Sequence, residues 1–124
     1  MADKKQRVVV VGASPDPKRY SHRAVCLLME YGHEVIPVNP SAPSIAGLPA
    51  VTGVSEIDCP VDTITLYVSA RVSSALAAQI KRLHPGRVIF NPGAENPSLR
   101  DDLEEQGIHT QEACTLVLLN TQQF

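Results

Sequence analysis

Val8-Val9-Val10-Val11-Gly12-Ala13-Ser14 is the segment from which the architecture of this chain can be worked out. Four consecutive β-branched residues are typical of a strand that is buried on both faces of a parallel sheet. Gly12 follows directly, and its missing Cβ lets the backbone turn sharply after the strand. Apolar residues then recur at helical spacing from Ala24 to Tyr31. The segment therefore predicts a strand, a tight loop and a helix.

Short apolar strands and amphipathic helices alternate along the rest of the chain. Strands are predicted at 34–38, 63–68, 87–91 and 108–111, and helices at 72–83, 99–106 and 114–119, with Ser98 as the cap of the second of these helices. Residues 39–60 are rich in Pro, Ser and Gly and are predicted as a loop with one short helical turn near Ser55. This order predicts an α/β fold, namely a Rossmann-like three-layer sandwich with a five-stranded parallel sheet.

The composition narrows the class of protein. The 124 residues suit one domain over 1–124, with residues 1–6 expected to form a flexible tail. A formal net charge of -2 argues against a nucleic-acid partner, and no apolar run approaches the roughly 20 residues of a membrane span. The three cysteines show neither paired nor metal-ligand spacing, which is typical of reduced thiols in a cytoplasmic protein.

Positive charge is concentrated around the first loop. Six of the 11 basic residues fall within residues 1–23, beside only two acidic residues. Lys18, Arg19 and Arg23 surround the predicted start of the first helix, where backbone amides and the helix dipole favour an anion. Ser14 and Ser21 add hydroxyl donors. We interpret this segment as a phosphate-binding loop for a nucleotide ligand, the alternative being an ordinary strand-to-helix turn with exposed cations.

The loop departs from the dinucleotide fingerprint. The GxGxxG pattern requires glycines at the positions of Ser14 and Pro17. The second strand ends in Val38-Asn39-Pro40 and lacks the acid that binds the ribose hydroxyls in NAD sites. The residues therefore disfavour NAD. An NAD(P)-dependent oxidoreductase and a nucleotide-free interaction scaffold remain as alternatives, because a fold alone does not determine function.

Four segments resemble the small stand-alone CoA-binding domain family, which is similar to the N-terminal domain of the succinyl-CoA synthetase alpha subunit. The resemblance is carried by the VVGAS loop at 10–14, the YSHR segment at 20–23, the VIPVNP segment at 35–40 and the NPGA segment at 91–94. It implies a Rossmann-type fold and CoA or an acyl-CoA as the ligand.

The resemblance also implies a role for each loop. The first loop would contact the pyrophosphate, the three cations would neutralise phosphates including the 3′-phosphate, and the end of the second strand would border the adenosine. The loop after the third strand would line the pantetheine path, and the loop after the fourth strand would form its far end. The implied ligand contacts are Gly12, Ala13, Ser14, Lys18, Arg19, Tyr20, Ser21, Arg23, Val38, Asn39, Pro40, Val68, Ser69, Ala70, Asn91, Pro92 and Gly93.

The sequence does not point to a catalytic group. The histidines are scattered over the ends of different predicted elements, at His22, His33, His84 and His109, and only His22 lies in the ligand loop. Glu95 and Cys114 fall at the predicted ligand edge, where a plain loop carboxylate and a small buried side chain are the simpler interpretations. We therefore expect a binding module without its own catalysis or metal. Its expected partners are the nucleotide ligand and either a second copy of the chain or an acyl-CoA enzyme.

Overall fold

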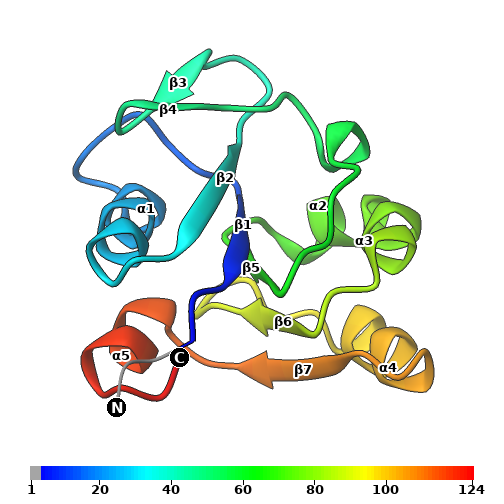
Figure 1. Ribbon diagram of the computed structural model, residues 1–124. Coiled ribbons are helices and arrows are strands. Elements are labelled where there is room, and N and C mark those ends of the chain that lie inside the picture. Colours follow the sequence, from blue (N-terminus) through cyan, green and yellow to red (C-terminus); the bar gives the residue numbers. More distant parts are fainter. Residues whose placement is uncertain (1–3) are drawn as a thin grey trace.

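A computed structural model describes residues 4–124 (Figure 1). Its elements, in chain order, are β1 (Arg7–Val11), α1 (Tyr20–Glu30), β2 (Glu34–Val38), β3 (Ser44–Ile45), β4 (Leu48–Pro49), the 3₁₀ turn η1 (Val54–Glu56), β5 (Thr63–Leu66), α2 (Ala70–Ala75), α3 (Ala77–Leu83), β6 (Arg87–Phe90), α4 (Pro97–Glu105), β7 (His109–Glu112) and α5 (Thr115–Asn120). Part of the predicted tail, residues 1–3, lies outside the described residues. Gln6 lies within that tail, but its backbone N–H donates to His33 Nδ1 and its side-chain oxygen accepts from Thr63 Oγ1.

The central sheet confirms the predicted fold class. Its five strands are ordered β2-β1-β5-β6-β7, and every neighbouring pair is parallel. Pro37, which lacks an N–H, lies in the edge strand β2. Its carbonyl accepts a hydrogen bond from Val51 on the outer side, so the missing donor also faces away from β1. The edge position explains how a proline is accommodated in this strand.

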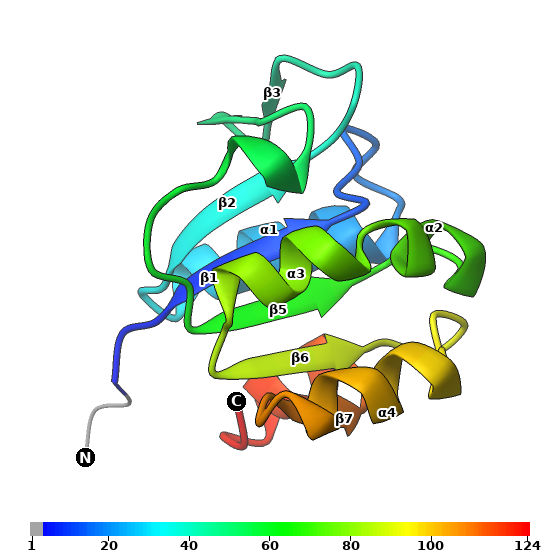
Figure 2. The ribbon, with the colours of Figure 1, turned by 90° about the vertical axis from the view of Figure 1, so that its right-hand side faces the viewer.

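Helices cover both faces of the sheet. In Figure 1, α1 and α5 lie on one side of the sheet, and α2, α3 and α4 lie on the other. The second group faces the viewer in Figure 2. Alternate residues of β1 serve the two layers, since Val9 and Val11 pack into the core that includes Ile80 of α3, whereas Val8 and Val10 pack with Leu28 of α1. The continuous valine run is therefore buried on both faces, as its composition predicted.

Two helix predictions were wrong in detail. The stripe from 72 to 83 forms two helices, α2 and α3, which meet at Leu76. Ser73 donates to Ala70 O, and such side-chain bonds compete with the helical backbone. The cap of α4 is Asn96 rather than Ser98, because Asn96 Oδ1 accepts from Leu99 N while Pro97 occupies the first helical position.

The segment 39–60 contains more structure than a loop. The short hairpin β3–β4 forms within it, and Val51 returns to pair with Val38 at the end of β2. The predicted helical turn is present as η1. In the part of the chain described, no helix is long and apolar enough to cross a membrane, and no group of side chains is spaced to hold a metal ion.

Candidate functional site

The loops that follow β1, β2, β5 and β6 lie at one edge of the sheet (Figure 2). This is the edge formed by the carboxyl ends of the parallel strands, where ligands of such folds bind. Four segments that are far apart in the sequence, residues 12–19, 38–41, 67–70 and 91–96, therefore come together. They contain most of the residues predicted to contact the ligand.

Gly12 is the point where the loop after β1 passes the loop after β5. Its φ of +82° lies in the left-handed region, and a Cβ placed on it would lie 2.8 Å from both Tyr67 O and Val68 Cγ1. No other residue fits this position without moving the backbone of the neighbouring loop. The absence of a side chain at Gly12 therefore lets the β1 and β5 loops come into direct contact.

Asn39 fastens the first loop to the end of β2. Its Nδ2 donates to Ala13 O at 2.8 Å, and its Oδ1 accepts from the backbone N–H groups of Ser41 and Ala42, each at 2.8 Å. Ala13 N also donates to Val38 O at 3.2 Å. The Asn39 amide is thus engaged in shaping the edge, and the predicted contact with adenosine would fall to its neighbours Val38 and Pro40.

An apolar pocket of about 170 Å³ opens beside Gly12. It is bounded by the ends of β1 and β2, the start of η1, the loop after β5, and α2. Its lining is Val11, Gly12, Val38, Pro40, Thr52, Gly53, Val54, Val68, Val72 and Leu76. Four of these residues were predicted to contact the ligand. The other six lining residues were not among the predicted contacts. Three of them, Thr52, Gly53 and Val54, lie near this pocket because Val51 pairs with Val38 at the end of β2.

The start of α1 offers unneutralised positive charge. The N-cap is Arg19, which makes no side-chain cap, and the first turn contains no acidic residue. Lys18 and Arg19 are exposed, and none of the ion pairs within residues 4–124 includes either of them. Both cations stand beside free helix amides, an arrangement that favours an anion.

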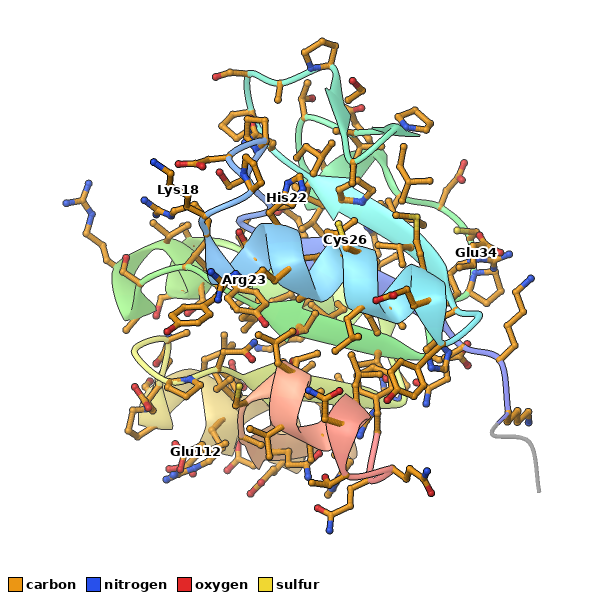
Figure 3. The ribbon with its side chains drawn as sticks, turned by 90° about the vertical axis from the view of Figure 1, so that its left-hand side faces the viewer. Lys18, His22, Arg23, Cys26, Glu34 and Glu112 are labelled. Carbon is orange, nitrogen blue, oxygen red and sulfur yellow. The ribbon has the colours of Figure 1, made fainter. Side chains whose placement is uncertain are left out.

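The loop before α1 is braced from within. Ser14 Oγ accepts from Asp16 N at 3.1 Å, and Asp16 Oδ1 accepts from Lys18 N at 3.0 Å. His22 Nδ1 lies 2.9 Å from Ser14 O, a distance that fits an Nδ1–H donor. Figure 3 shows His22 and Lys18 together at this end of α1. His22 therefore supports the loop, while Ser21 is buried at the second position of the helix.

Arg23 lies one helical turn beyond Arg19, and its backbone N–H donates to Arg19 O. Its guanidinium is 5.5 Å from the centre of the Tyr20 ring, and it lines a groove between α1 and α5. Figure 3 shows Arg23 on the side of α1 that faces α5. The apolar pocket at Gly12, by contrast, is bounded by α2 on the other face of the sheet. Arg23 therefore borders the groove on the α5 side of the sheet, whereas the pocket at Gly12 lies on the α2 side.

Asn91 forms a buried junction at the end of β6. It is 1% exposed, its Nδ2 donates to Thr65 Oγ1 at 2.6 Å and to Leu66 O at 2.9 Å, and its Oδ1 accepts from Thr115 N at 2.9 Å. Its side chain therefore joins β5, β6 and α5. Any ligand contact in this loop would fall to Pro92 and Gly93, which are exposed.

A second pocket, of about 290 Å³, lies at the far end of the edge. It is lined by Tyr20, Pro92 and Cys114. Between the two pockets, Ser69 accepts from Val72 N as the cap of α2, and Ala70 is exposed. Glu95 Oε1 accepts from Gly93 N at 3.0 Å, so this carboxylate stabilises its own loop.

The hydroxyl of Tyr67 is buried beneath this edge. It makes no hydrogen bond of good geometry within residues 4–124, and burial raises the pKa of Tyr67 to about 12 despite the nearby hydroxyls of Thr115 and Thr65. The neutral phenol is therefore favoured in the fold. This contribution to stability is complete below the ordinary pKa of 10 and is lost as the pH rises from 10 to about 12.

We expect Tyr67→Phe to flatten the fall in stability over that alkaline range. Urea unfolding at several pH values would measure the slope for the wild type and the variant. An unchanged slope in Tyr67→Phe would contradict the assignment. The exposed Tyr31 provides the matched control, as Tyr31→Phe is expected to keep the slope of the wild type.

Comparison with known proteins gives a consistent family relationship. The sequence model of the CoA binding domain matches residues 6–120. The uncharacterized protein YneT of Bacillus subtilis (strain 168) is 38% identical over 102 residues, which cover 82% of this chain and 76% of that protein.

Solved structures share the fold. A crystal structure of an uncharacterized protein superposes with a TM-score of 0.92 at 36% identity, covering 98% of this chain and 100% of the other. The dinucleotide-forming acetyl-coenzyme A synthetase 1 of Ca. Korarchaeum cryptofilum, in complex with phosphate and ADP, has a TM-score of 0.72 at 23% identity. That match covers 87% of this chain and 25% of the synthetase, and at this identity it establishes likeness of fold alone.

Proposed function

Because the chain belongs to the CoA-binding domain family, we propose that it binds CoA or an acyl-CoA at the carboxyl edge of its sheet and acts as a binding module. The observation behind this proposal is that the loop after β1 begins at an apolar pocket, at Gly12, and ends at the uncapped, cationic start of α1. CoA has the matching chemistry, since its planar adenine ring, whose faces suit apolar walls, is joined through a ribose to its phosphates.

We assign the adenine ring to the pocket bounded by Val38, Pro40 and Val68. Apolar walls on both sides suit a planar base, and binding pockets are commonly apolar with a few polar groups that orient the ligand. Thr52 provides a hydroxyl in the same lining. The backbone of Gly12, Ala13 and Ser14 leads from this pocket to the start of α1.

The phosphates fall to the start of α1 in this proposal. Lys18 and Arg19 supply charge and take part in no ion pair within residues 4–124, and the amide groups of the first turn add donors. Arginine and lysine serve phosphates differently, the first as a planar fork and the second as a point charge. We give Arg23 a lesser part, because it is stacked on Tyr20 and faces the groove beside α5.

The pantetheine arm would run along Val68, Ser69 and Ala70 toward Pro92. The second pocket, with Tyr20 and Cys114 in its lining, would then receive the thiol or acyl end. A binding role is favoured over a reaction because Asn39, Asn91 and Glu95 are all engaged in internal hydrogen bonds. The free cysteines suit a reducing compartment, and we propose the cytoplasm.

Isothermal titration calorimetry with CoA, NAD and FMN tests the choice of ligand. CoA is expected to bind more tightly than either alternative. Tighter binding of NAD would favour the oxidoreductase alternative, and absence of binding by all three would favour the interaction scaffold. Native mass spectrometry of the freshly purified protein would independently show whether CoA is retained.

Lys18→Ala and Arg19→Ala are each expected to weaken CoA binding about tenfold, because each removes a charge-assisted contact with a phosphate. The same titration measures the effect, with 3′-dephospho-CoA as a second ligand to identify which cation serves the 3′-phosphate. Lys5→Ala is the matched control, since Lys5 is an exposed cation just before β1, at the opposite edge of the sheet. Affinities equal to wild type in both loop variants would reject the phosphate assignment.

A further inference from the structure

The outer face of α1 and α5 exposes several apolar side chains. A groove of about 500 Å³ lies between the two helices, and Cys26, Leu27 and Leu116 contribute to its lining. Val117 of α5 is 56% exposed, and Tyr31, which ends α1, is 42% exposed. Figure 3 looks directly onto this face, with α1 above α5. An apolar strip of this kind is typical of an interaction surface.

The charges on this face are arranged in a particular order. Arg23 and Glu30 both line the groove and are seven residues apart on α1, which places them on the same side of the helix, about 10 Å apart along its axis. Cys26 and Leu27 lie between them. Within the described chain, neither Arg23 nor Glu30 takes part in an ion pair. The face thus has an apolar centre, a cation at one end and an anion at the other.

We propose that this face, which we call the α1–α5 face, joins two copies of the chain into a homodimer with their α1 helices antiparallel. A two-fold axis midway between Cys26 and Leu27 would place Arg23 opposite Glu30 of the partner subunit. The same operation would place Cys26 opposite Leu27 of the partner subunit. The surface is therefore complementary to itself, which is the condition for a symmetric dimer.

The charge order favours an antiparallel over a parallel arrangement of two copies. Parallel helices would bring Arg23 against the same cation of the other chain, which is unfavourable, whereas the antiparallel pair forms two ion pairs at the rim of an apolar centre. The dimer would also leave the pocket at Gly12 open, because α2, on the other face of the sheet, bounds that pocket. The pocket assigned to adenine would then stay accessible in the dimer.

Sedimentation velocity over a range of protein concentrations tests the proposal. The wild type is expected to dimerise, and Glu30→Arg is expected to raise the dimer dissociation constant roughly tenfold, because symmetry repeats the new repulsion twice. Arg23→Glu is expected to do the same. The double variant Arg23→Glu/Glu30→Arg should restore dimerisation toward the wild-type level, since it only reverses the polarity of both pairs.

Glu105→Arg is the matched control, because it reverses an exposed charge on α4, on the other face of the sheet. Its dimer should dissociate as the wild type does. A wild type that is monomeric at every concentration would overturn the proposal and leave the face to a different partner. A dimer that is insensitive to both single reversals, or that is not restored in the double variant, would overturn it equally.

Cross-linking locates the interface independently. A short bismaleimide is expected to join Cys26 to Cys26 of the partner subunit, and peptide mass spectrometry would identify the linked pair. Cross-links that join only Cys59 or Cys114 would place the interface on another face and overturn the proposal. Because the wild-type protein is used, this result does not depend on CoA binding and cannot be confused with failure of the proposed ligand.

Discussion

Gly12→Ala is expected to lower the free energy of unfolding by about 2–4 kcal/mol, the first of the two largest effects that the structure predicts. Two costs combine in this variant. A left-handed backbone costs an alanine roughly 1 kcal/mol more than a glycine, and the new methyl group would lie 2.8 Å from Tyr67 O. The second cost cannot be relieved by a rotamer change, because the neighbouring atom belongs to the backbone.

Urea unfolding followed by circular dichroism would measure this loss. Gly107→Ala is the matched control, because Gly107 has a φ of +81° and a Cβ added there would meet no neighbouring atom within 4 Å. The control should show only the conformational cost of roughly 1 kcal/mol. Equal losses in the two variants would refute the close approach at Gly12. Binding of CoA to Gly12→Ala, measured where the protein remains folded, should also fall because the loops must separate.

Asn91→Ala is expected to cost about 2–4 kcal/mol. The amide makes hydrogen bonds to Thr65 Oγ1, Leu66 O and Thr115 N in a site that is almost fully buried. Its removal would leave Thr115 N and Leu66 O without the side-chain partner they have in the fold, and an alanine would leave a cavity. Loss of stability should be accompanied by loosening of α5, whose first residue this side chain holds.

Thermal and urea denaturation would measure the loss, and amide hydrogen exchange at Thr115 would report the loosening of α5. Asn120→Ala is a suitable control, since Asn120 is exposed at the end of α5 and makes no side-chain hydrogen bond within residues 4–124. A stability of Asn91→Ala within about 0.5 kcal/mol of the wild type would contradict the junction.

The prediction of the sheet succeeded because the strands carry local signals. Val8–Val11 is a continuous β-branched run, and Glu34–Val38 was located to the residue. The helix boundaries were less accurate, since α1 begins at Tyr20, four residues before the apolar spacing that starts at Ala24, and α4 is capped by Asn96. Capping depends on which side chain reaches an amide three residues on, and both Asn96 and Ser98 are suitable residue types.

The candidate site was predicted in outline and revised in its detail. The loops were identified by the rule that strands of a parallel sheet end at one edge. The role of each polar side chain was not predicted. Asn39 and Asn91 donate hydrogen bonds to backbone carbonyls that lie 26 and 25 residues away in the sequence, respectively. Likewise, Val54 lines the pocket because Val51 pairs with Val38 at the end of β2. These contacts join residues that are distant in the sequence, and such contacts produce no periodic pattern of residue types.

The sequence by itself determined the α/β class, the parallel sheet, the loop at Gly12 and the concentration of cations beside it. Those features follow from the spacing of apolar residues, from backbone propensity and from charge. All three are local properties of the sequence that do not depend on tertiary contacts. Tertiary structure alone decided that Arg23 faces α5, that Asn91 is internal, and that an apolar pocket lies beside Gly12. Each depends on which distant segments pack together, and packing is set by the whole core rather than by any one stretch of the chain.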